Sequence, residues 1–441
     1  MKRLLILFIL LIGIVLTAEV VEIPLNITKA TDDPVPITID LKDLLDIVGF
    51  DVDVNWNSLK IVDGEGNVVQ FQIDDLDKNG KLSSDDILMT LLEGPAKIVL
   101  SEDDFTQEIN PCATIEDTED GILITFDNFK ALVNRSGLVR IVEFMGNEGT
   151  IVDEIGTARV AGWVGSTYYV DGNYGNSHQE KTSGDFIVEN MEVNPAGNVG
   201  VTVYSKLRSP QFVGLNQIIK TTIFKNGYIV ADTTFEFENY QDLMKLQPMI
   251  TRPITDISDD SVHILPTFRR LLWADQLNST PWEYWSDRGA SLKLNDKLFT
   301  VFPATDAMKP LWWGATYIYA SEENWRSNYS PSMKIGIAEI LPENPLVYAD
   351  YEKWIRGPQW IYESREFRDG YFMWIPGEFQ AYPSTEGIAA GGWEDYVMHF
   401  KAGDEVEFYR YFKLFHSEGI TEAINTIEEL THEIQSYSIG E

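Results

Sequence analysis

The chain has 441 residues, and its 69 acidic and 34 basic residues give a formal net charge of −35. Such an acidic chain repels phosphate groups, so nucleic acid and anionic membrane surfaces are not expected partners. Apolar residues make up 44% of the chain, which is enough to bury a large core and argues against disorder. The only cysteine, Cys112, excludes an intrachain disulfide.

Residues 1–18 have the pattern of a secretory signal peptide. Lys2 and Arg3 precede an apolar stretch at residues 4–16, and cleavage is expected after the small residue Ala18. An uncleaved anchor is the alternative. No later stretch is long and apolar enough to span a bilayer. We therefore expect a secreted or cell-surface protein, whose charge becomes −37 when the two basic residues are removed.

An acidic segment predicts a calcium loop. Its oxygen donors follow the spacing of a twelve-residue calcium loop, with Gly80 at the sharp turn. The predicted ligands are Asp75, Asp77, Asn79, Lys81 through its backbone carbonyl, Ser83 and Asp86. A plain acidic hairpin turn is the alternative, since Asp, Asn and Gly also favour turns for backbone reasons.

The segments beside this loop, residues 68–73 and 87–92, are short, rich in β-forming residues and partly alternating. They predict two strands, and so a hairpin rather than a helix–loop–helix sensor. Ca²⁺ would then be structural. Asp86 is shorter than the usual glutamate at the last ligand position, which favours modest affinity and suits the high calcium outside cells.

The rest of the chain predicts an all-β fold. Residues 35–40, 121–126 and 199–204 alternate or are rich in β-forming residues, and Gly, Asn and Asp turns separate such segments. A short helix is expected at residues 41–48. The apolar residues of segment 420–435 recur at helical spacing, which predicts one C-terminal helix packed on the β domain, with partner binding as the alternative.

Two acidic patches beside Asn110 and Pro111 suggest a domain boundary. We expect a signal peptide (1–18), a small β-barrel or sandwich domain with the calcium-loop hairpin (19–112), a large β-supersandwich (113–419), and a C-terminal helix and tail (420–441). No short repeat is present, which counts against a propeller or solenoid.

Two segments carry a resemblance to known families. Residues 35–37 and 72–80 resemble the small β-barrel domain that precedes some exo-rhamnogalacturonan-lyase-like proteins. Residues 218–232 look like a central hairpin of galactose-mutarotase-like β-supersandwiches. The resemblance covers about a tenth of the chain. It implies a sugar-handling protein but carries over no catalytic residue, and fold analogy alone supplies no reaction.

Aromatic residues give an independent argument for sugar. Ten of the twelve tryptophans follow residue 250, many of them beside Pro, Gly, Ser or Asn. A flat ring offers a stacking surface to a pyranose, although filling of a β core explains most of them equally well. Basic residues gather in the same half, where arginines bind carboxylates in a bidentate way or pair with surface acids. The predicted substrate-binding residues are Trp312, Trp313, Arg356 and Trp360.

A lyase needs a base, a group that neutralises the substrate carboxylate, and often a tyrosine acid. His178 and Tyr174 lie in a polar, glycine-rich segment typical of functional loops. With Arg269 they form the predicted catalytic set. His399 alternates with its neighbours and is equally compatible with a core position. Motifs of serine hydrolases, zinc proteases and nucleotide enzymes are missing from the sequence.

Two functional hypotheses remain open. The first is a secreted carbohydrate-active protein that binds a polysaccharide and, as a lyase-like enzyme, cleaves it. The second is a non-catalytic, calcium-stabilised cell-surface protein, either a glycan-binding module or a component of an envelope layer or filament. Self-association is compatible with both.

Overall fold

The computed structural model describes residues 20–48, 55–76, 78, 86–163, 178–247, 250–251, 258, 260–266, 269–270, 291–295, 297–303, 316–320, 325–342, 359–363, 371–375 and 398–440. The chain forms two compact units. The first comprises Met1–Pro111, Gly197–Val199 and Ser436–Glu441, and the second Cys112–Ala196 and Gly200–Gln435. The domain limits expected from the sequence stay a prediction, because compactness does not test independent folding. Among the described helices, none combines the length and apolarity needed to span a membrane.

The first unit contains two antiparallel sheets. One has the order β32 (Ser438–Ile439), β1 (Val21–Asn26), β7 (Ala96–Leu100), β3 (Lys60–Asp63), β4 (Val68–Val69); the other has the order β2 (Val35–Asp40), β6 (Ile87–Leu92), β5 (Phe71–Asp74). Helix α2 (Leu41–Val48) confirms the predicted short helix and buries Leu41 and Leu44. A 3-10 turn, η1 (Trp56–Ser58), precedes β3.

Strands β5 and β6 pair antiparallel from Phe71↔Thr90 to Asp74↔Ile87. The hairpin predicted around the acidic loop is therefore confirmed.

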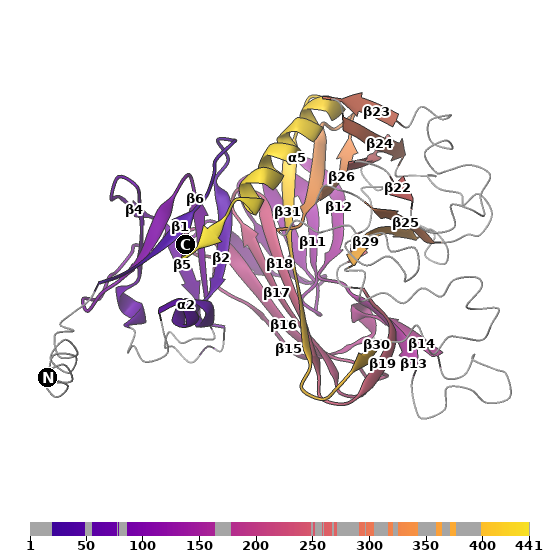
Figure 1. The fold of residues 1–441 in the computed structure, drawn as a ribbon, viewed down its shortest axis with the longest axis horizontal. Coiled ribbons are helices and arrows are strands. Elements are labelled where there is room, and N and C mark those ends of the chain that lie inside the picture. Colours follow the sequence, from indigo (N-terminus) through magenta and orange to yellow (C-terminus); the bar gives the residue numbers. More distant parts are fainter. Residues whose placement is uncertain are drawn as a thin grey trace, which may run out of the picture. The chain divides into compact units, whose positions relative to one another are not determined.

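The second unit is built on a ten-stranded sheet (Figure 1). Its order is β15 (Ile187–Val193), β16 (Gly200–Arg208), β17 (Leu215–Phe224), β18 (Tyr228–Phe237), β31 (Glu405–His416), β27 (Ile335–Ile340), β26 (Trp325–Ser330), β21 (Val262–Pro266), β24 (Lys297–Pro303), β23 (Ser291–Leu294). The predicted hairpin at 218–232 is its β17–β18 pair. Gly227 turns the chain there with φ of 83°, a left-handed conformation that glycine adopts without strain.

Three further sheets belong to the second unit. Their orders are β12 (Asn147–Ile155), β11 (Val139–Phe144), β10 (Phe129–Val133), β9 (Ile122–Thr125), β8 (Thr114–Asp117); β14 (His178–Thr182), β13 (Arg159–Trp163), β19 (Gln241–Gln247), β30 (Met398–Phe400); and β20 (Ile250–Thr251), β29 (Tyr371–Ile375), β28 (Gln359–Glu363), β25 (Thr316–Ala320), β22 (Arg269–Arg270). A 3-10 turn, η2 (Ser183–Asp185), follows β14.

Two apolar clusters fill the space on one face of the ten-stranded sheet, which we call the inner face. In the first, Val203, Ile223 and Leu414 pack with residues of β9–β12 such as Ile141. In the second, Ile219, Phe235 and Phe408 of the ten-stranded sheet pack with residues of β13 and β19. Burial of this apolar surface is the main stabilising contribution. The predicted all-β sandwich is confirmed.

The C-terminal helix α5 (Ile420–Gln435) is confirmed at its predicted bounds and contacts β26 (Figure 1). Its predicted apolar stripe is buried, with Ala423, Ile424, Ile427, Leu430 and Ile434 at most 4% exposed. Helical spacing put these residues on one face, and the β domain covers that face.

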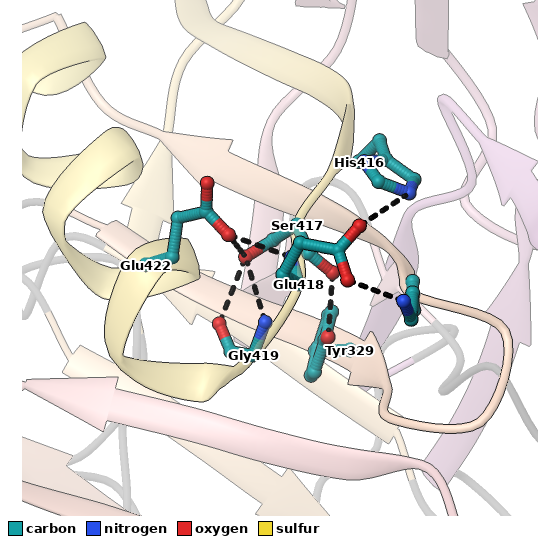
Figure 2. A network of polar contacts seen from close by, with 7 residues as sticks. Tyr329, His416, Ser417, Glu418, Gly419 and Glu422 are labelled. Atoms are coloured by element: carbon teal, nitrogen blue, oxygen red, sulfur yellow. Dashed lines mark hydrogen bonds and ion pairs between the residues drawn. The ribbon is translucent and has the colours of Figure 1, made fainter.

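Side chains fix the start of α5 (Figure 2). Glu422 in the first turn accepts the backbone N–H of Glu418 at 2.6 Å, and Ser417 Oγ accepts that of Gly419. Tyr329 of β26 donates its hydroxyl to the Ser417 carbonyl at 2.8 Å. The Gly419 N–H is one of the groups that a helix start leaves without an intrahelical partner, and the other two bonds hold the segment that leads into α5. His416 Nε2 lies 4.0 Å from Glu418 Oε1, next to these contacts at the helix start.

Candidate functional site

The five-stranded sheet around β28 gathers aromatic positions on one face. Its register aligns Tyr319, Trp360 and Trp374 in one row across β25, β28 and β29. A second row, two residues along each strand, contains Tyr317, Tyr362 and Phe372. Alternate positions of a strand belong to the same face of a sheet. We call these six positions the aromatic face: Tyr317, Tyr319, Trp360, Tyr362, Phe372 and Trp374.

The positions between them are aliphatic or Met. Ile318, Ile361 and Met373 form the intervening row and so belong to the opposite face of the same three strands. The rows therefore alternate between aromatic residues and residues that are aliphatic or Met.

An arginine position extends the first row. Arg270 of β22 pairs with Tyr319, whereas the predicted Arg269 pairs with Ala320 and takes the alternate position. The row therefore runs Arg270, Tyr319, Trp360, Trp374, with a cationic residue at one end.

The other predicted sugar and catalytic residues are distributed as follows. Trp360 lies in the aromatic face, while Trp312, Trp313, Arg356 and Tyr174 fall outside the described residues. His178 is the first residue of β14, where it pairs with Trp163 of β13. It is thus on the four-stranded sheet, and Arg269 on the five-stranded one.

Of the aromatic face, only Trp360 was predicted from the sequence, because that prediction rested on individual tryptophans. A usable signal was present, since aromatic residues recur at every second position in three segments: Tyr317 with Tyr319, Trp360 with Tyr362, and Phe372 with Trp374. Period-two aromatic pairs indicate strands with one aromatic face. Only the register shows that the three pairs are neighbours.

The calcium-loop hairpin presents its first and last predicted ligands across from each other. Asp74↔Ile87 is its last described rung, and Asp75 and Asp86 are the next residues on the two strands. Asp86 is fully buried and accepts the Leu76 backbone N–H at 3.2 Å. Aspartate is a residue type that Ca²⁺ prefers as a ligand, and these two lie at opposed register positions.

The remaining predicted ligands Asp77, Asn79, Lys81 and Ser83 fall outside the described residues. Within the described part of the chain, no group of three or more His, Cys, Asp or Glu residues has metal-binding geometry. The calcium site itself therefore stays a prediction.

Arg326, one of the basic residues that follow residue 250, has a different role from those expected. Arg326 of β26 is 2% exposed and donates its Nε to Glu339 Oε2 of β27 at 2.8 Å. Arg410 of β31, also buried, donates Nη1 to the other Glu339 oxygen. Burial lowers the pKa of both guanidinium groups below the ordinary arginine value, while the charge of Glu339 opposes the shift. Arg326 therefore forms a buried ion pair, neither a surface pair nor an open binding group.

Comparisons with known proteins found similarity in structure only. No family model matches the chain, and no curated protein matches it. An alpha-mannosidase from Enterococcus faecalis V583 is 11% identical, with a TM-score of 0.44, over 95% of this chain and 45% of its own. The chain thus spans about half the length of that protein.

Two smaller proteins cover less of the chain. A galactose mutarotase related enzyme from Lactobacillus acidophilus is 11% identical with a TM-score of 0.38, over 68% of this chain and 98% of its own. A galactose mutarotase-like protein from Lactobacillus casei ATCC 334 is 11% identical with a TM-score of 0.33, over 68% and 100%. Mutarotase-like proteins, which residues 218–232 resemble, are thus among the similar structures. The rhamnogalacturonan-lyase resemblance stays a prediction.

Proposed function

We propose that this chain is an exported carbohydrate-active protein that binds an acidic polysaccharide on the aromatic face and cleaves it by elimination. The observation that carries the proposal is the row of Arg270, Tyr319, Trp360 and Trp374 across four strands. Rings at these positions stack on the apolar faces of successive sugars. Their spacing is set by the sheet, because neighbouring strands lie about 4.8 Å apart.

The arginine gives the face its preference for acidic sugars. A guanidinium binds a carboxylate through two parallel hydrogen bonds, which adds direction to the charge attraction. Without such a group, a chain of charge −35 would repel a polyuronate at long range. Arg270 therefore selects for uronate residues, and the rings supply most of the contact area.

Calcium and export belong to the same proposal. Asp75 and Asp86, with Asp77, Asn79, Ser83 and the carbonyl of Lys81, would hold one Ca²⁺ and close the β5–β6 hairpin. The opposed positions of Asp75 and Asp86 support this assignment. A structural ion supplies rigidity that a chain with one cysteine cannot obtain from disulfides, and the signal-like residues 1–18 direct the chain to a calcium-rich compartment.

The test uses the intact chain with Ca²⁺ present. Affinity electrophoresis against polygalacturonate, alginate, hyaluronate and neutral polysaccharides measures binding, and absorbance of the unsaturated product measures cleavage. We expect retardation by at least one polyuronate, little by the neutral polymers, and a rise in absorbance. Binding without cleavage would leave a glycan-binding surface protein, the second hypothesis. A folded chain that binds no polymer contradicts the proposal.

A further inference from the structure

A histidine and an aspartate face each other at the end of the four-stranded sheet. Strands β19 and β30 pair Asp242 with His399. His399 Nδ1 lies 2.6 Å from Asp242 Oδ1 and 2.8 Å from the Tyr240 hydroxyl. The Tyr240 and His399 rings also stack, with centroids 6.1 Å apart. Both contacts on His399 use the same ring nitrogen.

The two partners differ in exposure in a way that suits proton transfer. The His399 side chain is 58% exposed, while the Asp242 side chain is 10% exposed. A carboxylate that accepts the Nδ1–H holds the imidazole in one tautomer, which leaves the Nε2 lone pair as the base. Asp242 is thus placed to position the ring, and the exposed ring is placed to meet a substrate.

The backbone around the pair is held firmly. The neighbouring residues Leu243 and Phe400 are buried in an apolar cluster with Phe237. The Phe237 and Phe400 rings are stacked, with centroids 4.1 Å apart and planes 4° from parallel. An orienting carboxylate is effective only when both strands keep their register, and these contacts fix it.

Trp163 and His178, which flank the segment that contains Tyr174, lie in the same part of the four-stranded sheet. Gly162 of β13 pairs with Leu243, next to Asp242, and the following residue Trp163 pairs with His178. His178, predicted as catalytic from its sequence context, therefore occupies a register position close to that of Asp242. Residues 163 and 178 are the two ends of the segment that contains Tyr174.

We propose that His399 is the proton-transfer group of this protein and that Asp242 is its positioning residue. The proposal rests on the proposed function, since the substrate is a uronate chain. His399 Nε2 takes the proton from the carbon beside the uronate carboxylate. The electrons of that C–H bond form the new C=C bond, the C–O bond to the next sugar breaks, and the proton on Nε2 passes to the departing oxygen.

Three variants test the assignment on the polyuronate that the wild-type chain cleaves fastest. His399→Gln should lower the cleavage rate by roughly 100-fold or more, the usual contribution of a general acid–base group, with polymer binding retained. Asp242→Asn should also slow cleavage. The matched control is His416→Gln, another exposed histidine beside a carboxylate, which should cleave at the wild-type rate.

A second readout does not depend on activity. In ¹⁵N-histidine NMR spectra of the wild-type chain, neutral His399 should carry its proton on Nδ1. Asp242→Asn should shift the tautomer balance toward Nε2–H, because an amide no longer favours the Nδ1–H form. Unchanged tautomer signals in this variant contradict the positioning role.

The remaining outcomes separate this proposal from the proposed function. If His399→Gln cleaves the polymer at the wild-type rate, the proton-transfer role is overturned, and the polysaccharide function remains in place. Binding by the wild-type chain without any cleavage also overturns that role and leaves the aromatic face as a binding surface. A chain that binds no polymer overturns the proposed function and this proposal together.

Discussion

Arg410 Nη1 donates a 2.7 Å hydrogen bond to Glu339 Oε1 between the neighbouring strands β31 and β27, with both side chains at most 2% exposed. The pair lies on the inner face of the ten-stranded sheet, where Ile337 and Phe412 belong to the apolar core. A carboxylate at this depth is tolerated because Arg326 binds its second oxygen. Removing Glu339 alone would leave two buried guanidinium groups without their shared partner.

Glu339→Ala should therefore lower the free energy of unfolding by about 3–5 kcal/mol, because it leaves two guanidinium groups buried without their shared carboxylate. Urea-induced unfolding measures the change. The control is Lys297→Ala, which breaks the more exposed pair with Glu428 and should cost less than about 1 kcal/mol. Equal losses in the two variants would contradict the role of burial.

Tyr411 should make stability depend on alkaline pH. Burial raises the pKa of Tyr411 from 10.0 to about 12, although a hydrogen bond with Tyr409 opposes the shift. The folded chain then holds this proton more tightly than the unfolded chain. Its contribution is fully present below pH 10 and is lost at about 1 kcal/mol per pH unit as the pH rises toward 12.

The comparison with Tyr411→Phe isolates this effect. Urea unfolding at several values between pH 9 and 11 should show a steeper loss of stability in the wild-type chain than in the variant. Parallel pH profiles would show that Tyr411 ionises equally easily in the folded and unfolded chains.

Removal of residues 436–441 should destabilise the first unit. Strand β32 pairs Ile439 with Leu25 and Ser438 with Asn26, and the Gly440 N–H donates to the Pro24 carbonyl at 3.0 Å. The truncation leaves this edge of β1 without its partner strand. The loss should be about 2–4 kcal/mol, at roughly 1 kcal/mol for each hydrogen bond.

Hydrogen exchange locates that effect. Amides of β1 should exchange faster in the truncated chain, while those of β17 and β18 keep their protection. A chain shortened only by Glu441 is the control. Unchanged exchange in β1 after the longer truncation would mean that β32 adds nothing to the sheet.

Calcium should raise the melting temperature, and chelation should lower it. Titration calorimetry should detect one bound ion with modest affinity, because the last ligand is Asp86. Asp75→Asn with Asp86→Asn should abolish uptake. The control Asp63→Asn changes another acidic turn, whose carboxylate already accepts the backbone N–H groups of Glu65 and Asn67. Uptake that survives the double substitution would place the ion elsewhere.

Local patterns predicted the local structure. The spacing of Ala423, Ile424 and Ile427 predicted helix α5, because residues at helical spacing share one face and their partners lie close together in the sequence. The β17–β18 hairpin was expected from the resemblance of residues 218–232 to a known hairpin, and the observed pairing agrees with it.

The site residues needed the register of distant strands. Trp360 was predicted from its ring type, but its neighbours Tyr319 and Trp374 come from separate strands, and no local pattern fixes which strands pair. Likewise, the alternation around His399 does not decide between a core position and a site position. Only the pairing of β30 with β19 brings His399 to Asp242. Long-range pairing is set by packing of the whole sheet.

The most direct test of the central claim is the affinity of Trp360→Ala/Trp374→Ala for the polyuronate that the wild-type chain binds most tightly. Loss of two stacking rings should weaken binding roughly 10–100-fold. Trp360→Phe/Trp374→Phe keeps flat rings and should retain most of the affinity. Equal affinity of the alanine variant and the wild-type chain would contradict binding on the aromatic face.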